Sequence, residues 1–121
     1  MIKPEILWEN YAAAWSLAEA VRRSELPLCL AEDITYCDPN GLITGCEGLS
    51  AYMAGFQQQV PGGRFEIRTV RAHHGRSLAH WALLLADGAV AQTGVSFAEH
   101  ASDGRFRAIT GFFDPAVNPS H

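Results

Sequence analysis

Two titratable side chains differ from their surroundings in ways that point to acid–base chemistry. Asp38 follows the β-prone run Ile34–Cys37 and precedes Pro39, so the chain at Asp38 is stiff and about to turn. A carboxylate at the mouth of an apolar pocket can act as a general base, because burial raises its pKa. His80 interrupts a run of Leu and Ala residues, and an unperturbed His titrates at about pH 6.5, which suits proton transfer.

Each of these two residues also has an ordinary structural interpretation. The run from Asp38 to Gly41, Asp-Pro-Asn-Gly, is a typical tight-turn sequence in which an aspartate caps the turn. His80 could equally be a buried histidine whose ring is hydrogen-bonded to a carbonyl group or to another side chain. The residue types alone leave both interpretations open. The choice depends on the helices and strands that position the two side chains.

The N-terminal half of the chain has the pattern of helices. Apolar residues recur at intervals of three and four through the first segment, which predicts a helix over about Pro4–Arg23. Ser24 is a suitable N-cap for a short second helix, Glu25–Ala31, in which Pro27 would fall in the first turn. A third helix is predicted over Glu47–Val60, because one face is apolar and a Pro-Gly-Gly sequence follows it.

The C-terminal half changes to the alternating pattern of strands. Four runs are separated by His74-Gly75, Asp87-Gly88 and Asp103-Gly104, and the last two are Asp-Gly pairs, a strong hairpin signal. Long strands joined by tight turns form an antiparallel meander, and helices that precede a meander pack on one of its faces, an α+β arrangement. We expect these strands at Arg64–His74, Arg76–Ala86, Ala89–His100 and Arg105–Phe113, and a short strand or loop at Leu42–Gly45.

The second of the four strands is apolar on both faces. The even-numbered residues from Leu78 to Ala86 share one face with His80, and the odd-numbered residues, including Trp81, share the other. An antiparallel strand with one wet face should instead alternate between apolar and polar residues. The helices can cover only one side, so we expect a second copy of the chain to cover the other, as a homodimer through the outer sheet face.

The composition favours one domain over residues 1–121. Hydrophobic residues make up 48% of the chain and charged residues 18%, as in compact globular proteins. The formal net charge is −4 and the basic residues form no run, which argues against a nucleic-acid partner. Charged residues interrupt the N-terminal segment and no apolar stretch could span a bilayer, so we expect no membrane partner and a cytoplasmic location.

Metal and cofactor motifs are missing from the sequence. Cys29, Cys37 and Cys46 are odd in number and have no CxxC spacing, and the histidines do not complete a zinc pattern. There is no G-x-G-x-x-G motif after a strand and no P-loop. We therefore expect free thiols, no metal and no cofactor.

Several short motifs, taken in order, resemble the nuclear transport factor 2-like superfamily, which includes ketosteroid isomerase, scytalone dehydratase, limonene epoxide hydrolase and the SnoaL-like polyketide cyclases. The motifs run from Tyr11-Ala-Ala-Ala-Trp15 through Tyr36-Cys-Asp-Pro39 to Gly111-Phe-Phe113, and the likeness covers about Trp8 to Pro115. The resemblance implies a cone-shaped fold, with three N-terminal helices packed on a curved, mostly antiparallel sheet around an apolar pocket. It also implies dimers through the outer sheet face.

The resemblance further implies roles for particular residues. Asp38 matches the general base of ketosteroid isomerase, and Tyr11 resembles the tyrosine that donates a hydrogen bond to the developing oxyanion. The strand face with His80 should look into the cone, which would make His80 a second acid or base. The second oxyanion acid of the isomerase would fall near Val95, where no Asp stands, so a plain ketosteroid isomerase is disfavoured. The Asp-Arg-Asp set of the epoxide hydrolases is also missing around Asp38.

These expectations define a function and its alternatives. We expect a cofactor-free enzyme of the SnoaL or isomerase type that removes a proton from a small apolar carbonyl compound, followed by isomerisation, cyclisation or dehydration. A non-catalytic ligand-binding or accessory domain and a dimeric scaffold with a filled pocket are the alternatives. The residues expected to line the pocket and contact a small apolar molecule suit an ordinary core equally well; they are Trp15, Tyr52, Phe56, Val95, Ile109 and Phe113.

Overall fold

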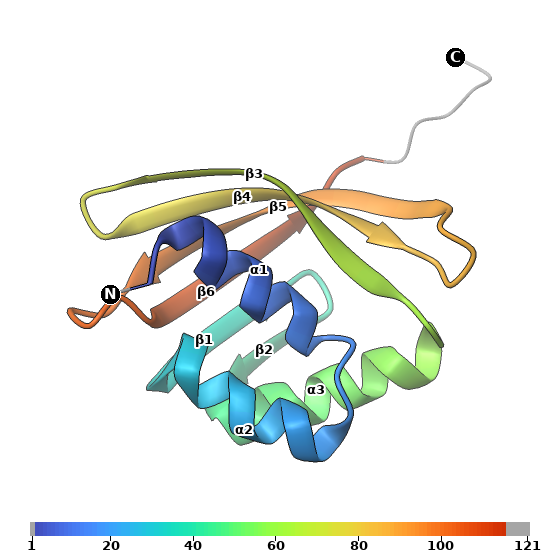
Figure 1. The fold of residues 1–121 in the computed structure, drawn as a ribbon, viewed down its shortest axis with the longest axis horizontal. Coiled ribbons are helices and arrows are strands. Elements are labelled where there is room, and N and C mark those ends of the chain that lie inside the picture. Colours follow the sequence, from blue (N-terminus) through green and yellow to red (C-terminus); the bar gives the residue numbers. More distant parts are fainter. Residues whose placement is uncertain (1, 116–121) are drawn as a thin grey trace.

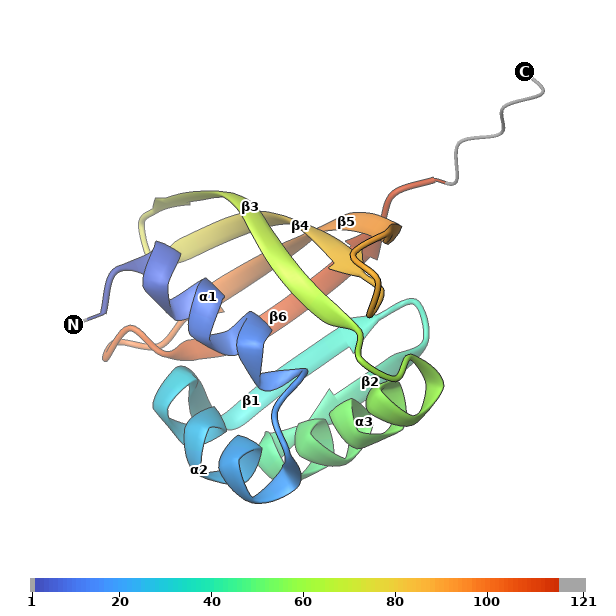
Figure 2. The same cartoon turned by 45° about the vertical axis from the view of Figure 1, so that its right-hand side comes forward.

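Three helices cover one face of a curved six-stranded sheet in the computed structural model, which describes residues 2–115 (Figures 1 and 2). The predicted α+β class, with helices before a mostly antiparallel sheet, is confirmed. The helices are α1 (Pro4–Ala14), α2 (Glu19–Cys29) and α3 (Gly45–Gln59). The strands are β1 (Leu30–Asp38), β2 (Gly41–Thr44), β3 (Arg64–His73), β4 (Arg76–Leu84), β5 (Val90–His100) and β6 (Phe106–Phe113).

The sheet has the strand order β2-β1-β6-β5-β4-β3. Strands β3 to β6 form the antiparallel meander expected from the Asp-Gly turns, and their bounds lie within a few residues of the predicted ones. The Asp-Pro-Asn-Gly sequence closes the β1–β2 hairpin, where Asp38 pairs with Gly41. Strand β1 runs parallel to β6, so the β1–β2 hairpin extends the meander through a pairing between residues far apart in sequence.

The predicted single helix over Pro4–Arg23 is wrong, because the first helix ends at Ala14 and a second helix starts at Glu19. The N–H groups of Trp15, Ser16 and Leu17 bond to carbonyls three residues back, which tightens the last turn and ends the helix. The carbonyls left free by the break find donors elsewhere, since the Gln57 side-chain amide donates to the carbonyls of both Trp15 and Leu17. Tertiary contacts thus stabilise a break that the periodicity does not reveal.

The second helix also begins earlier than predicted, at Glu19 rather than Glu25. Ser24 lies inside it and its hydroxyl donates to the carbonyl of Val21, so the residue does not act as an N-cap. Pro27 falls near the end of the helix, where its missing N–H removes one bond, and the helix stops two residues later. Strand β1 then starts at once, four residues before the predicted Ile34.

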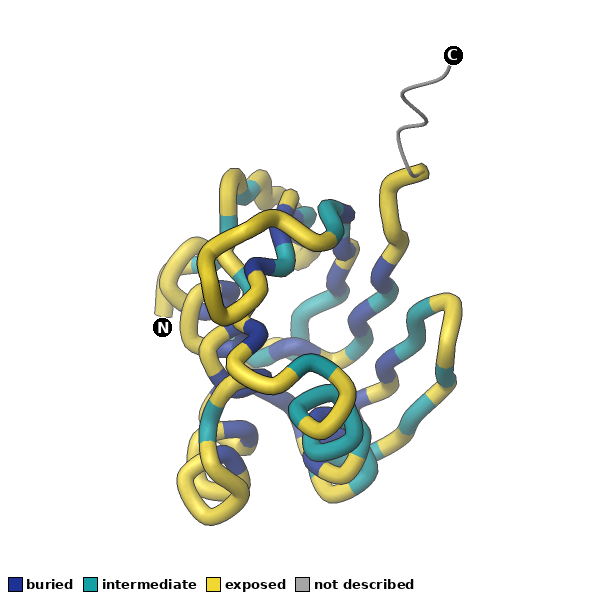
Figure 3. Tube along the Cα trace, turned by 90° about the vertical axis from the view of Figure 1, so that its right-hand side faces the viewer, coloured by how far each residue is buried: buried dark blue, intermediate teal, exposed yellow. Residues whose placement is uncertain are grey.

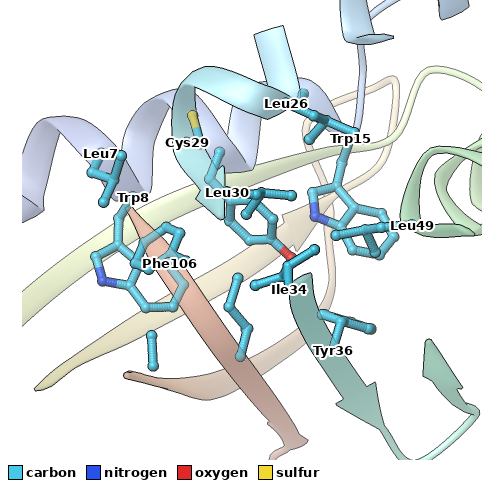
Figure 4. Close-up of a cluster of buried hydrophobic side chains, with 14 of the residues drawn as sticks. Leu7, Trp8, Trp15, Leu26, Cys29, Leu30, Ile34, Tyr36, Leu49 and Phe106 are labelled. Carbon is cyan, nitrogen blue, oxygen red and sulfur yellow. The ribbon is translucent and has the colours of Figure 1, made fainter. Parts of the chain in front are cut away.

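The core lies between the helices and the concave face of the sheet. Trp8 of α1 packs on Phe106 of β6, with ring centroids 4.6 Å apart (Figure 4). Figure 3 shows buried and more exposed residues alternating along the strands, as expected for a sheet with one covered face. Across residues 2–115, no helix is both long and apolar enough to span a membrane.

Candidate active site

A cavity of about 710 Å³ opens between α1, α3 and the concave face of the sheet. Every tryptophan and every tyrosine of the chain lines it, and Asp38 is the single charged side chain among the described lining residues. The lining residues come from α1, α3, all the strands except β2, and the turns that follow α1, β1 and α3. The full set is Trp8, Tyr11, Ala12, Trp15, Tyr36, Asp38, Asn40, Ala51, Tyr52, Gly55, Phe56, Gln59, Val60, Phe65, Ile67, Trp81, Leu83, Gln92, Ser96, Gly111 and Phe113.

The carboxylate of Asp38 is held by three donors from its surroundings. The Tyr36 hydroxyl donates to Oδ2 at 2.6 Å, and the Tyr52 hydroxyl donates to Oδ1 at 2.8 Å and to Oδ2 at 3.0 Å. The backbone N–H of Asn40 donates to Oδ1 at 2.7 Å. The bond from Asn40 shows that the Asp38 side chain caps the β1–β2 turn, as the turn interpretation predicts. The same carboxylate also lines the cavity.

The two phenols that hold Asp38 keep their protons under ordinary conditions. Burial raises the pKa of Tyr36 well above its usual range, and so do Tyr11 and the hydrogen bond to Asp38. Burial also raises the pKa of Tyr52, again with a contribution from the bond to Asp38. Each hydroxyl therefore acts as a neutral donor that fixes the direction of the carboxylate without cancelling its charge.

Tyr11 presents a different kind of phenol to the cavity. Its side chain is only 5% exposed, and its hydroxyl oxygen is buried without a hydrogen-bond partner among the described residues. Burial raises the pKa of this phenol, the adjacent Trp15 side chain lowers it in part, and the nearby Asp38 charge raises it again. A buried polar atom without a partner is costly, and the proton of the Tyr11 hydroxyl is not donated to any described group.

The prediction that His80 faces the cavity is wrong. His80 is exposed and absent from the lining, whereas its neighbour Trp81 lines the cavity and donates through Nε1 to Ser96 Oγ at 3.0 Å. Side chains alternate along a strand, so choosing the wrong face of β4 moves every residue on it to the opposite side. Because both faces of β4 are apolar, the sequence pattern gave no means of choosing between them.

Two of the six residues expected to line the cavity, Val95 and Ile109, do not line it. Val95 lies directly opposite His80 in the β4–β5 pair, so it shares the outer face and does not line the cavity. Ile109 is on the concave side but is 1% exposed and packs in the core away from the cavity. The other four expected residues, Trp15, Tyr52, Phe56 and Phe113, all line the cavity.

Tyr36 and Trp81 are two of the lining residues that sequence reasoning missed. Tyr36 stands two residues before Asp38 on β1, and residues two apart on a strand share a face. That local spacing could have placed the Tyr36 phenol beside the carboxylate. No comparable signal exists for Trp81, because its face of β4 becomes the inner one only through the packing of α1 and α3 on the sheet.

A separate series of hydrogen bonds joins α1 to strands β4 and β5. Trp8 Nε1 donates to Ser77 Oγ at 2.9 Å, and Ser77 Oγ lies 2.7 Å from His100 Nε2. His100 Nδ1 is 2.7 Å from the carbonyl oxygen of Gly104, so Nδ1 carries the proton and Nε2 accepts from the serine. Ser77 is buried and absent from the lining, so this series of hydrogen bonds fixes the orientation of Trp8 rather than reaching a ligand.

Metal-binding groups do not gather around this site. Within residues 2–115, no three His, Cys, Asp or Glu side chains are arranged to hold a metal ion. The described cysteines are free, and burial raises the pKa of the Cys29 thiol to about 11. The titratable groups that line the cavity are one carboxylate and three protonated phenols, and the neutral polar residues Asn40, Gln59, Gln92 and Ser96 lie among the aromatic lining residues.

Known proteins resemble this chain in both sequence pattern and fold. A family model described as the SnoaL-like domain matches residues 8–109. No curated protein sequence matches the chain. A candidate isomerase of the SnoaL-like family from Agrobacterium tumefaciens strain C58 is 28% identical, with a TM-score of 0.85 over 91% of this chain and 96% of that one.

Two further solved structures are similar at lower identity. A candidate ketosteroid isomerase from Kribbella flavida DSM 17836 is 25% identical, with a TM-score of 0.70 over 94% of this chain and 79% of that chain. A SnoaL-like protein of unknown function from Burkholderia thailandensis E264 is 16% identical, with a TM-score of 0.72 over 95% of this chain and 100% of that chain. This last likeness concerns the fold alone.

Proposed function

The chain belongs to the family of SnoaL-like domains, and from this membership and the geometry of its cavity we propose that it is a cofactor-free enzyme acting on a small apolar carbonyl compound. In this proposal Asp38 removes a proton from the carbon beside the carbonyl group, and Tyr11 stabilises the oxyanion that forms. The product then arises by isomerisation, cyclisation or dehydration. His80 has no part in the reaction, since it lies outside the cavity.

The unpartnered hydroxyl of Tyr11 is the observation that carries this proposal. It is the one described side-chain polar atom that is buried without a hydrogen bond, and both Tyr11 and Asp38 line the cavity. A donor that is fixed in place, dry and free before the ligand arrives needs no reorganisation when negative charge develops. The raised pKa of Tyr11 keeps its proton in place at neutral pH.

The proposed step conserves atoms and charge. The carboxylate takes the C–H proton, and the electron pair of that bond moves through the α-carbon to the carbonyl oxygen, giving an enolate and a neutral Asp38. The Tyr11 O–H donates a hydrogen bond to the enolate oxygen. Return of the proton from Asp38 to a different carbon completes an isomerisation. In a dehydration the same proton passes from Asp38 to the hydroxyl group on the β-carbon, which leaves as water.

Ligand binding without catalysis is the second candidate, and the hydrogen bonds of Asp38 favour it. A carboxylate has about four acceptor sites, and three donors already occupy most of those of Asp38. A base needs an open lone pair directed at the substrate, and at most one remains, on Oδ2. The phenols of Tyr36 and Tyr52 are therefore positioning groups in the first proposal and permanent partners of Asp38 in the second.

Proton abstraction can be tested directly by deuterium exchange. We expect the protein to accelerate the exchange of the α-protons of 2-tetralone, an aromatic ketone that fits an apolar cavity, measured by NMR in D₂O. Asp38→Asn should lower the rate by about 10²–10⁴-fold, the usual contribution of a general base. Tyr11→Phe should lower it by about 10²-fold or more, as for loss of one oxyanion donor.

Asp33→Asn is the matched control, because Asp33 is exposed on the same strand and lies outside the cavity. It makes the same change of charge and should leave the exchange rate unchanged. If neither 2-tetralone nor a panel of enones and β-keto compounds exchanges or reacts faster with the protein, the enzyme proposal fails. Retained binding of these compounds would then favour the non-catalytic alternative.

We also propose that two copies pair through the outer face of the sheet. Phe97 and Phe112 are 38% and 57% exposed there. Leu78 lies directly opposite Phe97, and Val95 lies directly opposite both Phe112 and His80, so these residues form one patch on neighbouring strands. Exposed aromatic patches of this kind mark association sites, and a second copy presents the same patch in return.

A further inference from the structure

The charge inside the cavity restricts the kind of molecule that it can hold. Asp38 contributes one negative charge, and no Lys, Arg or His is among the described lining residues. None of the ion pairs formed within residues 2–115 involves Asp38. A partly buried carboxylate without a counter-charge next to an aromatic wall leaves a negative potential that is screened less than on the open surface.

The groups that satisfy Asp38 do not remove this charge. Tyr36 and Tyr52 donate as neutral phenols, and their raised pKa values keep them neutral. The third donor is a backbone N–H, which is also neutral. Hydrogen bonds make the ionised carboxylate tolerable in a half-buried place, yet the net charge of the site stays at minus one. An anionic ligand would be repelled, and a cation would gain Coulomb energy.

The aromatic side chains around Asp38 supply a second attraction for a cation. The rings of Trp15, Tyr36 and Tyr52 lie mutually close, with centroids 5.8 Å apart for Trp15–Tyr36 and for Tyr36–Tyr52 and 6.0 Å apart for Trp15–Tyr52. Figure 4 shows Trp15 and Tyr36 from different elements on the same side of the core. An ammonium group that lies over the face of one of these rings would be attracted by its π electrons, most strongly where water is excluded.

We propose that the physiological ligand of this cavity is an apolar molecule that carries a positive charge, an ammonium or substituted ammonium group, which lies against Asp38 and the rings of Trp15, Tyr36 and Tyr52. The inference rests on the proposed function in one respect, that the cavity is the ligand site. It does not require that the protein is a catalyst. The body of the ligand would contact the remaining aromatic wall, and the open acceptor site on Oδ2 would receive an N–H donor where one is present.

Two small probes of opposite charge test the preference in the unmodified protein. Benzyltrimethylammonium and phenylmethanesulfonate have the same benzyl group and compact, fully charged heads. All three tryptophans line the cavity, so quenching of the intrinsic fluorescence reports binding. We expect the cation to bind at least about tenfold more tightly than the anion, since one ion pair or cation–π contact of ordinary strength gives such a factor.

Substitution of Asp38 then separates charge recognition from shape. Asp38→Asn should raise the Kd of benzyltrimethylammonium about tenfold or more, and it should change the Kd of neopentylbenzene, its uncharged carbon isostere, by less than about twofold. The retained binding of neopentylbenzene also shows that the variant is folded. Asp33→Asn changes the net charge equally at an exposed site and should leave both values as they are.

The outcomes distinguish this inference from the proposed function. Equal binding of the cation and the anion, or equal effects of Asp38→Asn on the charged and uncharged probes, would overturn the inference and leave the enzyme proposal intact. Cation selectivity that depends on Asp38, together with no faster exchange or reaction of 2-tetralone or of the enones and β-keto compounds, would support the inference and contradict the enzyme proposal. Failure of every probe to bind, whatever its charge, would overturn the inference.

Discussion

The hydroxyl of Tyr52 donates to both carboxylate oxygens of Asp38, at 2.8 Å to Oδ1 and 3.0 Å to Oδ2. Tyr52 is on α3 and Asp38 ends β1, so this contact joins a helix to the strand on which the cavity carboxylate stands. Tyr36 adds a donor from the same strand. The direction of the Asp38 side chain is therefore set by two elements of the fold and not by its own turn alone.

Loss of the Tyr52 hydroxyl should weaken this junction. We expect Tyr52→Phe to lower the free energy of unfolding by about 1–2 kcal/mol, because a half-buried hydrogen bond to a charged acceptor is lost while the ring is kept. Urea denaturation measures the change. In the Asp38→Asn background the same substitution should cost about 1 kcal/mol less, since its charged partner is gone. Equal costs in both backgrounds would mean that the two side chains are not coupled.

The stability of the protein should fall at alkaline pH. The tyrosines have pKa values raised above the ordinary value of 10.0, with burial the largest cause for each. Above about pH 10 the unfolded chain releases these protons and the folded protein keeps them. The folded state then binds more protons, so the free energy of unfolding declines as pH rises, and the full stability is present below about pH 10.

Urea denaturation at about pH 8 and pH 11, with tyrosinate absorbance recorded alongside, measures this effect. Tyr36→Phe removes one of the shifted groups and should make the decline shallower. The pKa values of all three tyrosines of the chain are raised, so the absorbance should rise only as the protein unfolds. Phenols that ionise at about pH 10 in the folded protein would contradict the prediction.

A methyl group at Gly94 should disturb the cavity wall. Gly94 lies opposite Trp81 in the β4–β5 pair, and a Cβ at this position would overlap the Trp81 ring and the carbonyl oxygen of Phe112. We expect Gly94→Ala to cost about 1–3 kcal/mol, as overpacking does, and to alter the tryptophan fluorescence. Gly55→Ala is the control, because a Cβ there meets no atom within 4 Å and alanine favours the helix.

The proposed dimer should depend on the outer face of the sheet. We expect Phe112→Glu to convert a dimer to a monomer in sedimentation equilibrium, because a buried carboxylate without a partner is costly at an apolar interface. Leu28→Glu is a matched control, since Leu28 on α2 is 61% exposed and lies away from that face. A wild-type protein that is monomeric at micromolar concentration would refute the pairing.

Local spacing was enough to predict most of the architecture. The Asp-Gly turns and the alternation of side chains predict the meander β3 to β6, because hairpin geometry depends on residues that are neighbours in sequence. The importance of Asp38 was also visible locally, from a short strand followed by Pro39. Its partner Tyr36 could have been found in the same way, since the two residues share a strand face.

Features that depend on distant contacts could not be read from the sequence. The helix break after Ala14 requires donors from Gln57, which lies on another helix. The inner face of β4 is set by the helices packed over the sheet, so the prediction for His80 failed and Trp81 was overlooked. Periodicity cannot choose between two apolar faces, because each is equally favourable to bury until a partner covers one of them.

The cavity likewise depends partly on local sequence and partly on the tertiary structure. The sequence by itself supplied a carboxylate at a rigid turn, a tyrosine on a helix and a strong preference for one α+β arrangement. Only the tertiary structure brought Tyr11, Tyr52 and Asp38 from two helices and one strand into one space, and only it left the Tyr11 hydroxyl without a partner. Hydrogen-bond satisfaction and burial are properties of the packed chain, since they depend on every group that approaches a given atom.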